Sequence, residues 1–204
     1  MYIEIILSII AGYLLGSVPF ALVIGKLFYK TDIRNYGSKN LGGGNAGRVL
    51  GKRAGLAVMT LDILKVTLAI LIASWFEHRD ITMIIAGLAA AIGHCYPEFA
   101  RLKGGKAVAT MYGFLFGMAL VGSYSFWIFF FLPLIVFLIV LYIGKIISLA
   151  SICSAIFITA YIYFTEESWM MFVAVLIFTV LIIYRHKKNI IRLIREEENK
   201  ITWM

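Results

Sequence analysis

The sequence predicts an all-α integral membrane protein with about seven transmembrane helices in a single domain, residues 1–204. Two observations carry this prediction: the composition and the placement of the charges. The chain is 62% hydrophobic and only 15% charged, with a mean hydropathy of +0.93. A soluble domain is nearer roughly 45–50% apolar and about 25% charged. A water-soluble core cannot bury this excess in a chain of 204 residues, so a lipid bilayer must provide the apolar environment.

Seven apolar segments are long enough, or nearly so, to cross a membrane, since about 20 residues span the hydrocarbon core. They are Tyr2–Ile24, Ala54–Phe76, Ile81–Pro97, Ala107–Val121, Tyr124–Tyr142, Ile147–Phe164 and Ser168–Tyr184. The third and fourth are short, and five or six spans remain an alternative if one of them is re-entrant. The first carries Glu4, lacks Lys and Arg, and is too long for a cleaved signal peptide, so we expect it to be retained.

The basic residues alternate with these segments. Of the 19 Lys and Arg, 17 follow the first, third, fifth or seventh segment. Positively charged loops remain cytoplasmic, so we predict an external N-terminus and a cytoplasmic C-terminus in the cell (plasma) membrane. Topology and anionic lipid headgroups account for the net charge of +8, and we expect no nucleic-acid partner. Apolar residues spaced among the charges of the tail, 190–194, predict a short amphipathic helix on the inner surface.

The first inner loop, Asp32–Arg48, is rich in glycine and asparagine. Glycine lets backbone N–H groups approach an anion closely, and successive N–H groups can form an anion-binding nest. Ser38, Asn40, Asn45 and Arg48 are residue types that bind phosphate or hydroxyl groups, and Arg48 can bind a phosphate through two parallel hydrogen bonds. The loop therefore predicts a phosphate site, with a flexible tether as the alternative.

The second inner loop contains Lys103, Gly104, Gly105 and Lys106 and runs into the fourth segment through Thr110. A Gly-Gly pair ahead of a helix is expected to place free N–H groups at the positive end of the helix dipole. The flanking lysines add charge, so the loop predicts a second anion site. It does not match the nucleotide-binding P-loop. The alternative is a plain turn with membrane-anchoring lysines.

Few ionisable groups lie within the apolar segments. Asp62 and Lys65 are three residues apart in the second segment, on one face of a helix. Intramembrane charge is unfavourable by about 2.5–3.5 kcal/mol per group, so we expect an ion pair, with a polar cavity facing both residues as the alternative. His94, near the inner end of the third segment, is either a packing residue or a site residue. His186 lies where the seventh segment meets the tail and is either a site residue or an interfacial anchor. His78, in a short outer loop, is expected to be solvated.

Together these motifs resemble the bacterial acyl-phosphate:glycerol-3-phosphate acyltransferase family over essentially the whole chain. The matching stretches are Gly16–Pro19, Gly37–Arg48, Asp62–Lys65, Gly93–Pro97, Lys103–Thr110, Ser148–Ser151, Arg185–Asn189 and Glu198 with Lys200. The resemblance implies acyl transfer from acyl phosphate to the 1-hydroxyl of glycerol 3-phosphate, giving lysophosphatidate and phosphate in phospholipid synthesis. Its implied partners are these two substrates and membrane lipids, with no cofactor and no metal.

The resemblance also implies roles for particular residues. Ser38, Arg48, His186 and Asn189 are expected to form the catalytic set. A larger set is expected to bind the two substrates: Asn40, Asn45, His94, Lys103, Gly104, Gly105, Lys106, Thr110 and Glu198.

Two absences agree with this chemistry. Cys95 and Cys153 are isolated, form neither a metal pattern nor a disulfide framework, and are expected to be packing residues. Many soluble and peripheral acyltransferases use a His with an Asp five positions later, but those positions hold Met83, Phe99 and Ile191. An acyl phosphate is already activated, so the departing phosphate could itself take the hydroxyl proton.

The chain also departs from the family pattern. Lys39 replaces the second glycine of a usual Gly-Ser-Gly-Asn, and Gly43-Gly44 replaces Ala-Thr. Met111 stands where a small residue is common, and Asn199 where proline is usual. A catalytically altered paralogue or scaffold of lipid synthesis is one alternative. A small organic-phosphate transporter is another, although such a protein should show repeat symmetry.

Overall fold

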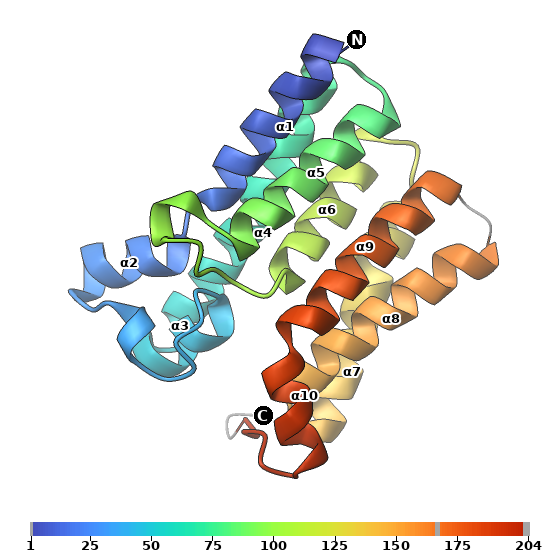
Figure 1. Ribbon diagram of the computed structural model, residues 1–204. Helices are drawn as coiled ribbons and strands as arrows, with labels where there is room; N and C mark the ends of the chain where they lie inside the picture. The colour runs from blue at the N-terminus through green and yellow to red at the C-terminus, as the bar shows by residue number, and fades with distance from the viewer. Residues whose placement is uncertain (1, 166–167, 202–204) are drawn as a thin grey trace. The chain divides into compact units, whose positions relative to one another are not determined.

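The computed structural model describes residues 2–165 and 168–201, which form helices joined by loops, with no β-strand among them (Figure 1). The chain divides into two compact units, unit 1 with residues 1–122 and unit 2 with residues 123–204. The all-helical class is confirmed.

Unit 1 is built from four main helices and the shorter helices that connect them. Its elements are α1 (Tyr2–Ser17), α2 (Phe20–Tyr29), η1 (Ile33–Asn35), α3 (Gly43–Leu50), α4 (Lys52–Phe76), α5 (Asp80–Cys95), η2 (Glu98–Ala100) and α6 (Val108–Val121). In Figure 1, α1, α4, α5 and α6 lie side by side, with α1 against α5 and α4 against α6. The ends of these helices place α2, α3 and the segment 97–107 at one end of the unit.

Small residues set the close contact between α1 and α5. Gly12 and Gly16, four residues apart on α1, face the backbone of Ala86 and Ala90 on α5. A Cβ added at either glycine would collide with the facing carbonyl group. Small residues spaced by four allow two helix backbones to approach closely in a membrane, where van der Waals packing holds helices together. Gly93, near the end of α5, continues this contact.

The first predicted span is broken near its inner end. A continuous segment Tyr2–Ile24 was expected, but α1 ends at Ser17 and α2 begins at Phe20. Pro19 has no backbone N–H, and its ring disfavours the helical conformation of Val18. The predicted continuous helix is therefore divided in two, and α2 turns away from the axis of α1 (Figure 1), although Tyr2–Tyr29 as a whole is long and apolar enough to cross a membrane.

Unit 2 is a layer of three long helices with a short helix after the last. Its elements are η3, a π-helical stretch (Trp127–Phe131), α7 (Leu132–Gly144), α8 (Ile147–Thr165), α9 (Trp169–Arg185) and α10 (Lys187–Ile194). The middle helix, α8, packs on both α7 and α9. Thr159 of α8 and Thr179 of α9 share a buried hydrogen bond of 2.8 Å. The short helix α10 corresponds to the predicted amphipathic helix of the tail.

Within the described residues, five helical segments are individually long and apolar enough to cross a membrane. They are Tyr2–Tyr29, Lys52–Phe76, Asp80–Ala100, Trp127–Gly144 and Ile147–Thr165. A sixth candidate is α9 taken together with α10, although the two are bent by 61°. At 14 residues α6 is about 21 Å long, shorter than a bilayer core of about 30 Å. A multi-pass membrane protein is confirmed, and seven spans remain a prediction.

Candidate active site

A buried asparagine organises the first predicted loop. The Asn45 carboxamide oxygen accepts a 2.8 Å hydrogen bond from the Ser38 backbone N–H. Its Nδ2 donates to the carbonyls of Ile33 and Tyr36, each at 3.3 Å. Gly37 has a φ of +58°, and a Cβ there would collide with the Asn45 oxygen. Asn45 was predicted to bind substrate, and in this structure its side chain closes the loop.

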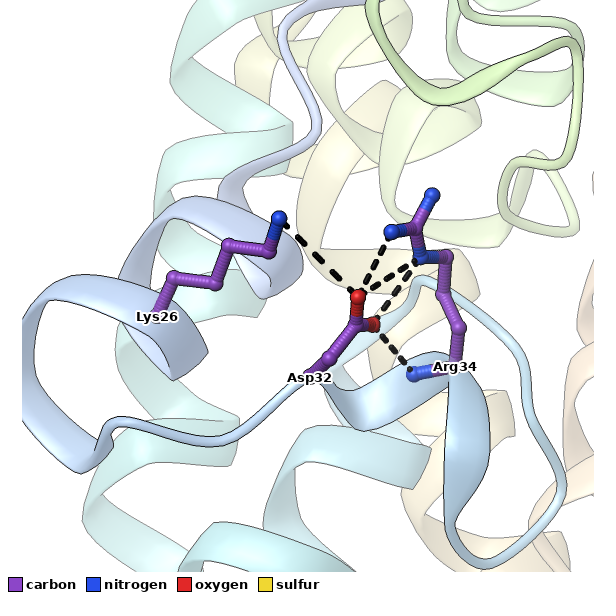
Figure 2. Close-up of polar contacts among 3 residues, drawn as sticks. All are labelled: Lys26, Asp32 and Arg34. Atoms are coloured by element: carbon purple, nitrogen blue, oxygen red, sulfur yellow. Dashed lines mark hydrogen bonds and ion pairs between the residues drawn. The ribbon is translucent and has the colours of Figure 1, made fainter.

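An ion-pair cluster holds the start of the same loop (Figure 2). The Arg34 guanidinium donates to both Asp32 oxygens, with Nη2 2.6 Å from Oδ2 and Nε 2.9 Å from Oδ1. Lys26 lies more loosely, with Nζ 3.9 Å from Oδ2. The hydrogen bonds from Arg34, together with its charge and that of Lys26, lower the pKa of Asp32 to about 2. The positive charge of Arg34 is therefore already compensated by the Asp32 carboxylate.

Two of the predicted catalytic residues present their functional groups to solvent. Ser38 and Arg48 are both exposed. Within residues 2–165 and 168–201, the Ser38 hydroxyl and the Arg48 guanidinium make no hydrogen bond or ion pair. Arg48 lies on α3, one turn after the exposed Gly44, and Asn40 lies half-buried just ahead of that helix. This face of the loop offers a hydroxyl group and a guanidinium group to an anionic ligand.

The Lys-Gly-Gly-Lys loop differs from its prediction. We expected Gly104 and Gly105 to offer free N–H groups at the start of a helix, but α6 begins only at Val108. Both glycines are buried, and the Gly105 N–H donates to the His94 carbonyl at 3.0 Å. A Cβ at Gly104 would lie 2.5 Å from Pro97 Cδ. The glycines are thus needed for packing on the end of α5, and sequence reasoning missed this cause.

The two lysines and the threonine of this loop differ in their exposure to solvent. Lys103 is exposed and Lys106 is half-buried. The Thr110 hydroxyl is buried and donates to the Ala107 carbonyl at 2.9 Å, so it serves the first turn of α6. Ala107 itself has a φ of +64°, a left-handed conformation that is strained for a residue with a side chain. The two lysines are the groups of this loop best suited to meet a phosphate.

The predicted Asp62–Lys65 ion pair is present inside unit 1. Lys65 Nζ lies 2.7 Å from Asp62 Oδ1, and the two side chains are 3% and 1% exposed. His94 joins them, with its Nδ1 3.1 Å from Lys65 Nζ. His94 is thus packed inside unit 1, as expected of a packing residue. Its backbone carbonyl also accepts the Gly105 N–H, so the same residue contacts the loop that was predicted as an anion site.

The other predicted site residues lie in unit 2. His186 is buried at the junction of α9 and α10, and its Nδ1 lies 2.8 Å from the Ile182 carbonyl. A carbonyl only accepts hydrogen bonds, so Nδ1 carries the proton there. His186 is thereby held in one orientation by the last turn of α9.

Glu198 is the centre of a polar network that ties the tail to α8 and α10. Its Oε1 accepts from Asn189 Nδ2 at 2.5 Å and from the Ser148 hydroxyl at 3.1 Å. Its Oε2 accepts from Arg192 Nε at 2.6 Å. Burial raises the pKa of Glu198, but the hydrogen bonds from Arg192, Asn189 and Ser148 outweigh it, so the pKa lies below the ordinary 4.5. Sequence reasoning missed Arg192, although its three-residue spacing from Asn189 on α10 places the two on one face of the helix and was a usable signal.

Because Glu198 is the acceptor in this network, we expect the order of the C-terminal tail to depend on pH. A depressed pKa means that the contribution of Glu198 is complete above the ordinary value of 4.5 and is lost as pH falls through the lower folded value. A nitroxide at Glu196→Cys, in a Cys95→Ala/Cys153→Ala background, should be ordered at neutral pH and mobile in acid. Glu198→Gln should make the label mobile at neutral pH as well. A label that is equally ordered in both proteins at neutral pH would contradict a role of Glu198 in holding the tail.

The departure at Lys39 has a measurable consequence. Lys39 has a φ of +59°, where a side chain costs about 1–2 kcal/mol and glycine is free. No atom lies within 4 Å of a Cβ placed at Gly44, so threonine fits there. We expect Gly44→Thr alone to be nearly neutral and to become favourable after Lys39→Gly, if the lysine replaces the lost hydroxyl contact. The measurement is kcat/KM for the four proteins, and strict additivity would show no compensation.

The fold and these sites define a class of protein: a multi-pass helical membrane protein with basic, glycine-rich loops at one end of unit 1. Within the described residues, no group of three His, Cys, Asp or Glu could hold a metal ion. The family model for glycerol-3-phosphate acyltransferase matches residues 6–196. The chain belongs to this family.

Individual relatives agree over the full length. The chain is 42% identical to the glycerol-3-phosphate acyltransferase of Bacillus subtilis, covering 98% of this chain and 99% of that protein. The Staphylococcus haemolyticus enzyme of that name is 41% identical over 98% and 99% of the two chains. A crystal structure of PlsY (YgiH), an integral membrane glycerol 3-phosphate acyltransferase in its glycerol 3-phosphate form, aligns with a TM-score of 0.87 and 36% identity, covering 97% of this chain and 96% of that one.

Proposed function

We propose that this chain transfers an acyl group from acyl phosphate to the 1-hydroxyl of glycerol 3-phosphate. The products are lysophosphatidate and inorganic phosphate, and the reaction belongs to phospholipid synthesis. The observation that carries the proposal is the full-length family match to glycerol-3-phosphate acyltransferases. The free Ser38 hydroxyl and Arg48 guanidinium, and the lysines flanking Gly104 and Gly105, support two phosphate-bearing substrates.

The chemistry balances without a covalent enzyme intermediate. The substrate hydroxyl oxygen forms a bond to the acyl carbonyl carbon, and the bond from that carbon to the phosphate oxygen breaks. The hydroxyl proton passes to the departing phosphate. The protein then contributes by positioning both phosphates and by neutralising the charge that develops in the transition state. Arg48, Lys103 and Lys106 are assigned the charge-neutralising part, and Ser38 donates to a phosphate oxygen.

The assay uses purified protein with labelled glycerol 3-phosphate and one acyl donor at a time. We expect labelled lysophosphatidate with acyl phosphate, and none with acyl-CoA or acyl carrier protein. Efficient turnover of acyl-CoA would refute the proposed donor. Absence of product with every donor, from folded protein, would refute the activity.

We further propose seven spans, with the N-terminus external and the C-terminus cytoplasmic. Among the described residues, five helical segments qualify and α9 qualifies together with α10, so α6 decides the seventh span. Much of α6 is buried against other helices, and a helix shielded by protein can cross a membrane with less lipid-facing length. The 17 of 19 basic residues predicted inside support the orientation, which places Ser38, Arg48 and Lys106 on the cytoplasmic side.

The orientation gives a direct prediction. A reporter fused after residue 204 should be active only in the cytoplasm, and an epitope placed before residue 1 should be accessible only from outside. Fusions after residues 78 and 145 should report external and cytoplasmic positions, because residue 78 follows the second predicted span and residue 145 follows the fifth. A C-terminal reporter found outside the cell, together with an external N-terminal epitope, would contradict an odd number of spans.

A further inference from the structure

The short helix α10 has two different faces. Its inner face holds Asn189, which is buried and donates to Glu198, and the helix begins directly after the buried His186. Asn189 and His186 are two of the predicted catalytic residues. The opposite side of α10 exposes two isoleucines, Ile191 at 51% and Ile194 at 78%. The side chains that hold the predicted site and those that face outward therefore lie on opposite sides of one helix.

Basic residues border the two isoleucines. Lys187 and Lys188 precede them, Arg195 follows them, and all three are exposed. At helical spacing these cations lie on the same side as the isoleucines, and together they form the outer face of α10. Within the described residues none of the three takes part in an ion pair, and Glu196–Glu197 come only after the helix has ended. An apolar stripe bordered by cations is the pattern of helices that bind an anionic lipid surface.

The bend between α9 and α10 gives α10 a suitable direction. The two helices are bent by 61°. With α9 as a span along the membrane normal, α10 is inclined to the membrane plane by 90° − 61° = 29°. Amphipathic helices that bind lipid lie close to this plane, with their apolar side chains at the boundary between headgroups and acyl chains.

Two tyrosine–lysine pairs mark the level of the membrane surface in unit 2. Lys187 Nζ lies 5.1 Å from the centre of the Tyr184 ring, at the end of α9. Lys145 Nζ lies 4.4 Å from the centre of the Tyr142 ring, at the end of α7. The tail after α10 returns to the end of α7, where the Ile201 N–H donates to the Lys145 carbonyl at 2.7 Å. Tyrosine and lysine gather where membrane helices meet the headgroups, so this end of the unit is suited to that level.

We propose that the outer face of α10 docks on the anionic lipid surface of the inner leaflet, and that this contact holds His186 and Asn189 in place. At eight residues α10 is too short to be a stable helix by itself, so its order depends on the contacts of both faces. Lipid is the occupant, rather than an acidic protein, because α10 continues a membrane helix at the level of the headgroups. The link to activity rests on the acyltransferase function proposed for this chain.

The first test measures the depth of α10 and requires no activity. A nitroxide is attached at Ile194→Cys in the Cys95→Ala/Cys153→Ala background, in nanodiscs of phosphatidylcholine with about one third phosphatidylglycerol. We expect the label to be reached by oxygen and shielded from an aqueous nickel complex, and to lie less deeply in phosphatidylcholine alone. A label at Glu196→Cys, beyond the helix, is the control and should be reached by the nickel complex in both bilayers. An Ile194→Cys label open to nickel in both would overturn the docking and favour a soluble partner.

The second test asks whether the contact supports activity. We expect the kcat/KM of the wild type to rise at least about threefold when phosphatidylglycerol is added to the nanodiscs. Lys187→Gln/Lys188→Gln removes two charges from the outer face and should reduce this response to less than about 1.5-fold. The matched control is Lys30→Gln/Arg53→Gln, which removes two exposed charges from unit 1 and should keep the full response. Equal loss of the response in both double variants would overturn the role of α10.

The two measurements separate failure of the docking from failure of the proposed activity. Folded wild type that makes no lysophosphatidate in any bilayer refutes the activity, while the label at Ile194→Cys still tests the docking. A label that docks as expected, with a wild-type kcat/KM indifferent to phosphatidylglycerol, overturns the link between the lipid contact and His186 and Asn189. Thermal midpoints report the fold of each variant. A shielded label together with a response lost only in Lys187→Gln/Lys188→Gln supports the proposal.

Discussion

Replacing Arg48 with alanine should lower kcat/KM at least about tenfold. A charge-assisted contact contributes about 1.5–3 kcal/mol, and 1.4 kcal/mol is one decade in rate. Arg48 is exposed on α3 and makes no ion pair within the described residues, so its charge is available to a substrate phosphate. Arg48→Lys should rescue only in part, because a point charge cannot reproduce two parallel hydrogen bonds.

A neighbouring arginine provides the control. Arg53 is also exposed and lies in the first turn of α4, so Arg53→Ala removes the same charge from the same end of unit 1. We expect Arg53→Ala to change kcat/KM by less than about twofold, as screened surface charges contribute little. Equal losses in the two variants would mean that Arg48 acts only through the overall positive potential. Full activity of Arg48→Lys would argue against a bidentate contact.

Several features could be predicted from sequence because they depend on local spacing or on composition. The apolar excess required a membrane. The three-residue spacing of Asp62 and Lys65 predicted their ion pair, since such residues lie on one face of a helix. Spacing of apolar residues in the tail predicted α10. The helix break at Pro19 could also have been predicted from the conformational limits of proline, but the first segment was predicted as one continuous helix.

Other features depend on tertiary contacts between distant residues. His94 lies 29 residues from Lys65, and nothing in either local sequence indicates that they meet. The same holds for Ser148 and Glu198, which are 50 residues apart. The glycines of the second loop were singled out because free N–H groups were expected there. Gly105 instead donates to the end of α5, and the structural reason for glycine is the space that His94 occupies.

Gly104→Ala should be more damaging than Gly105→Ala and should resist rescue. A Cβ at Gly104 would collide with the His94 carbonyl and lie 2.5 Å from Pro97 Cδ and 2.8 Å from the Cys95 carbonyl oxygen. These are backbone and ring atoms that cannot rotate away, so the loop itself must move. A misplacement of about 1 Å at a reacting group can cost about a hundredfold in rate, and we expect a loss of that order in kcat/KM with acyl phosphate.

The rescue pattern separates the two glycines. His94→Ala removes the imidazole but keeps the backbone carbonyl, so it should relieve Gly105→Ala and leave Gly104→Ala unrelieved. Gly144→Ala, at the end of α7, is the matched control, because its added Cβ would be in van der Waals contact at 3.4 Å from Leu149 Cδ2. The measurements are kcat/KM for each single and double variant, with thermal midpoints in detergent. Near-normal activity of Gly104→Ala would show that the loop can move away from α5 without a loss of activity. Packing of the loop on α5 would then not be required for substrate binding.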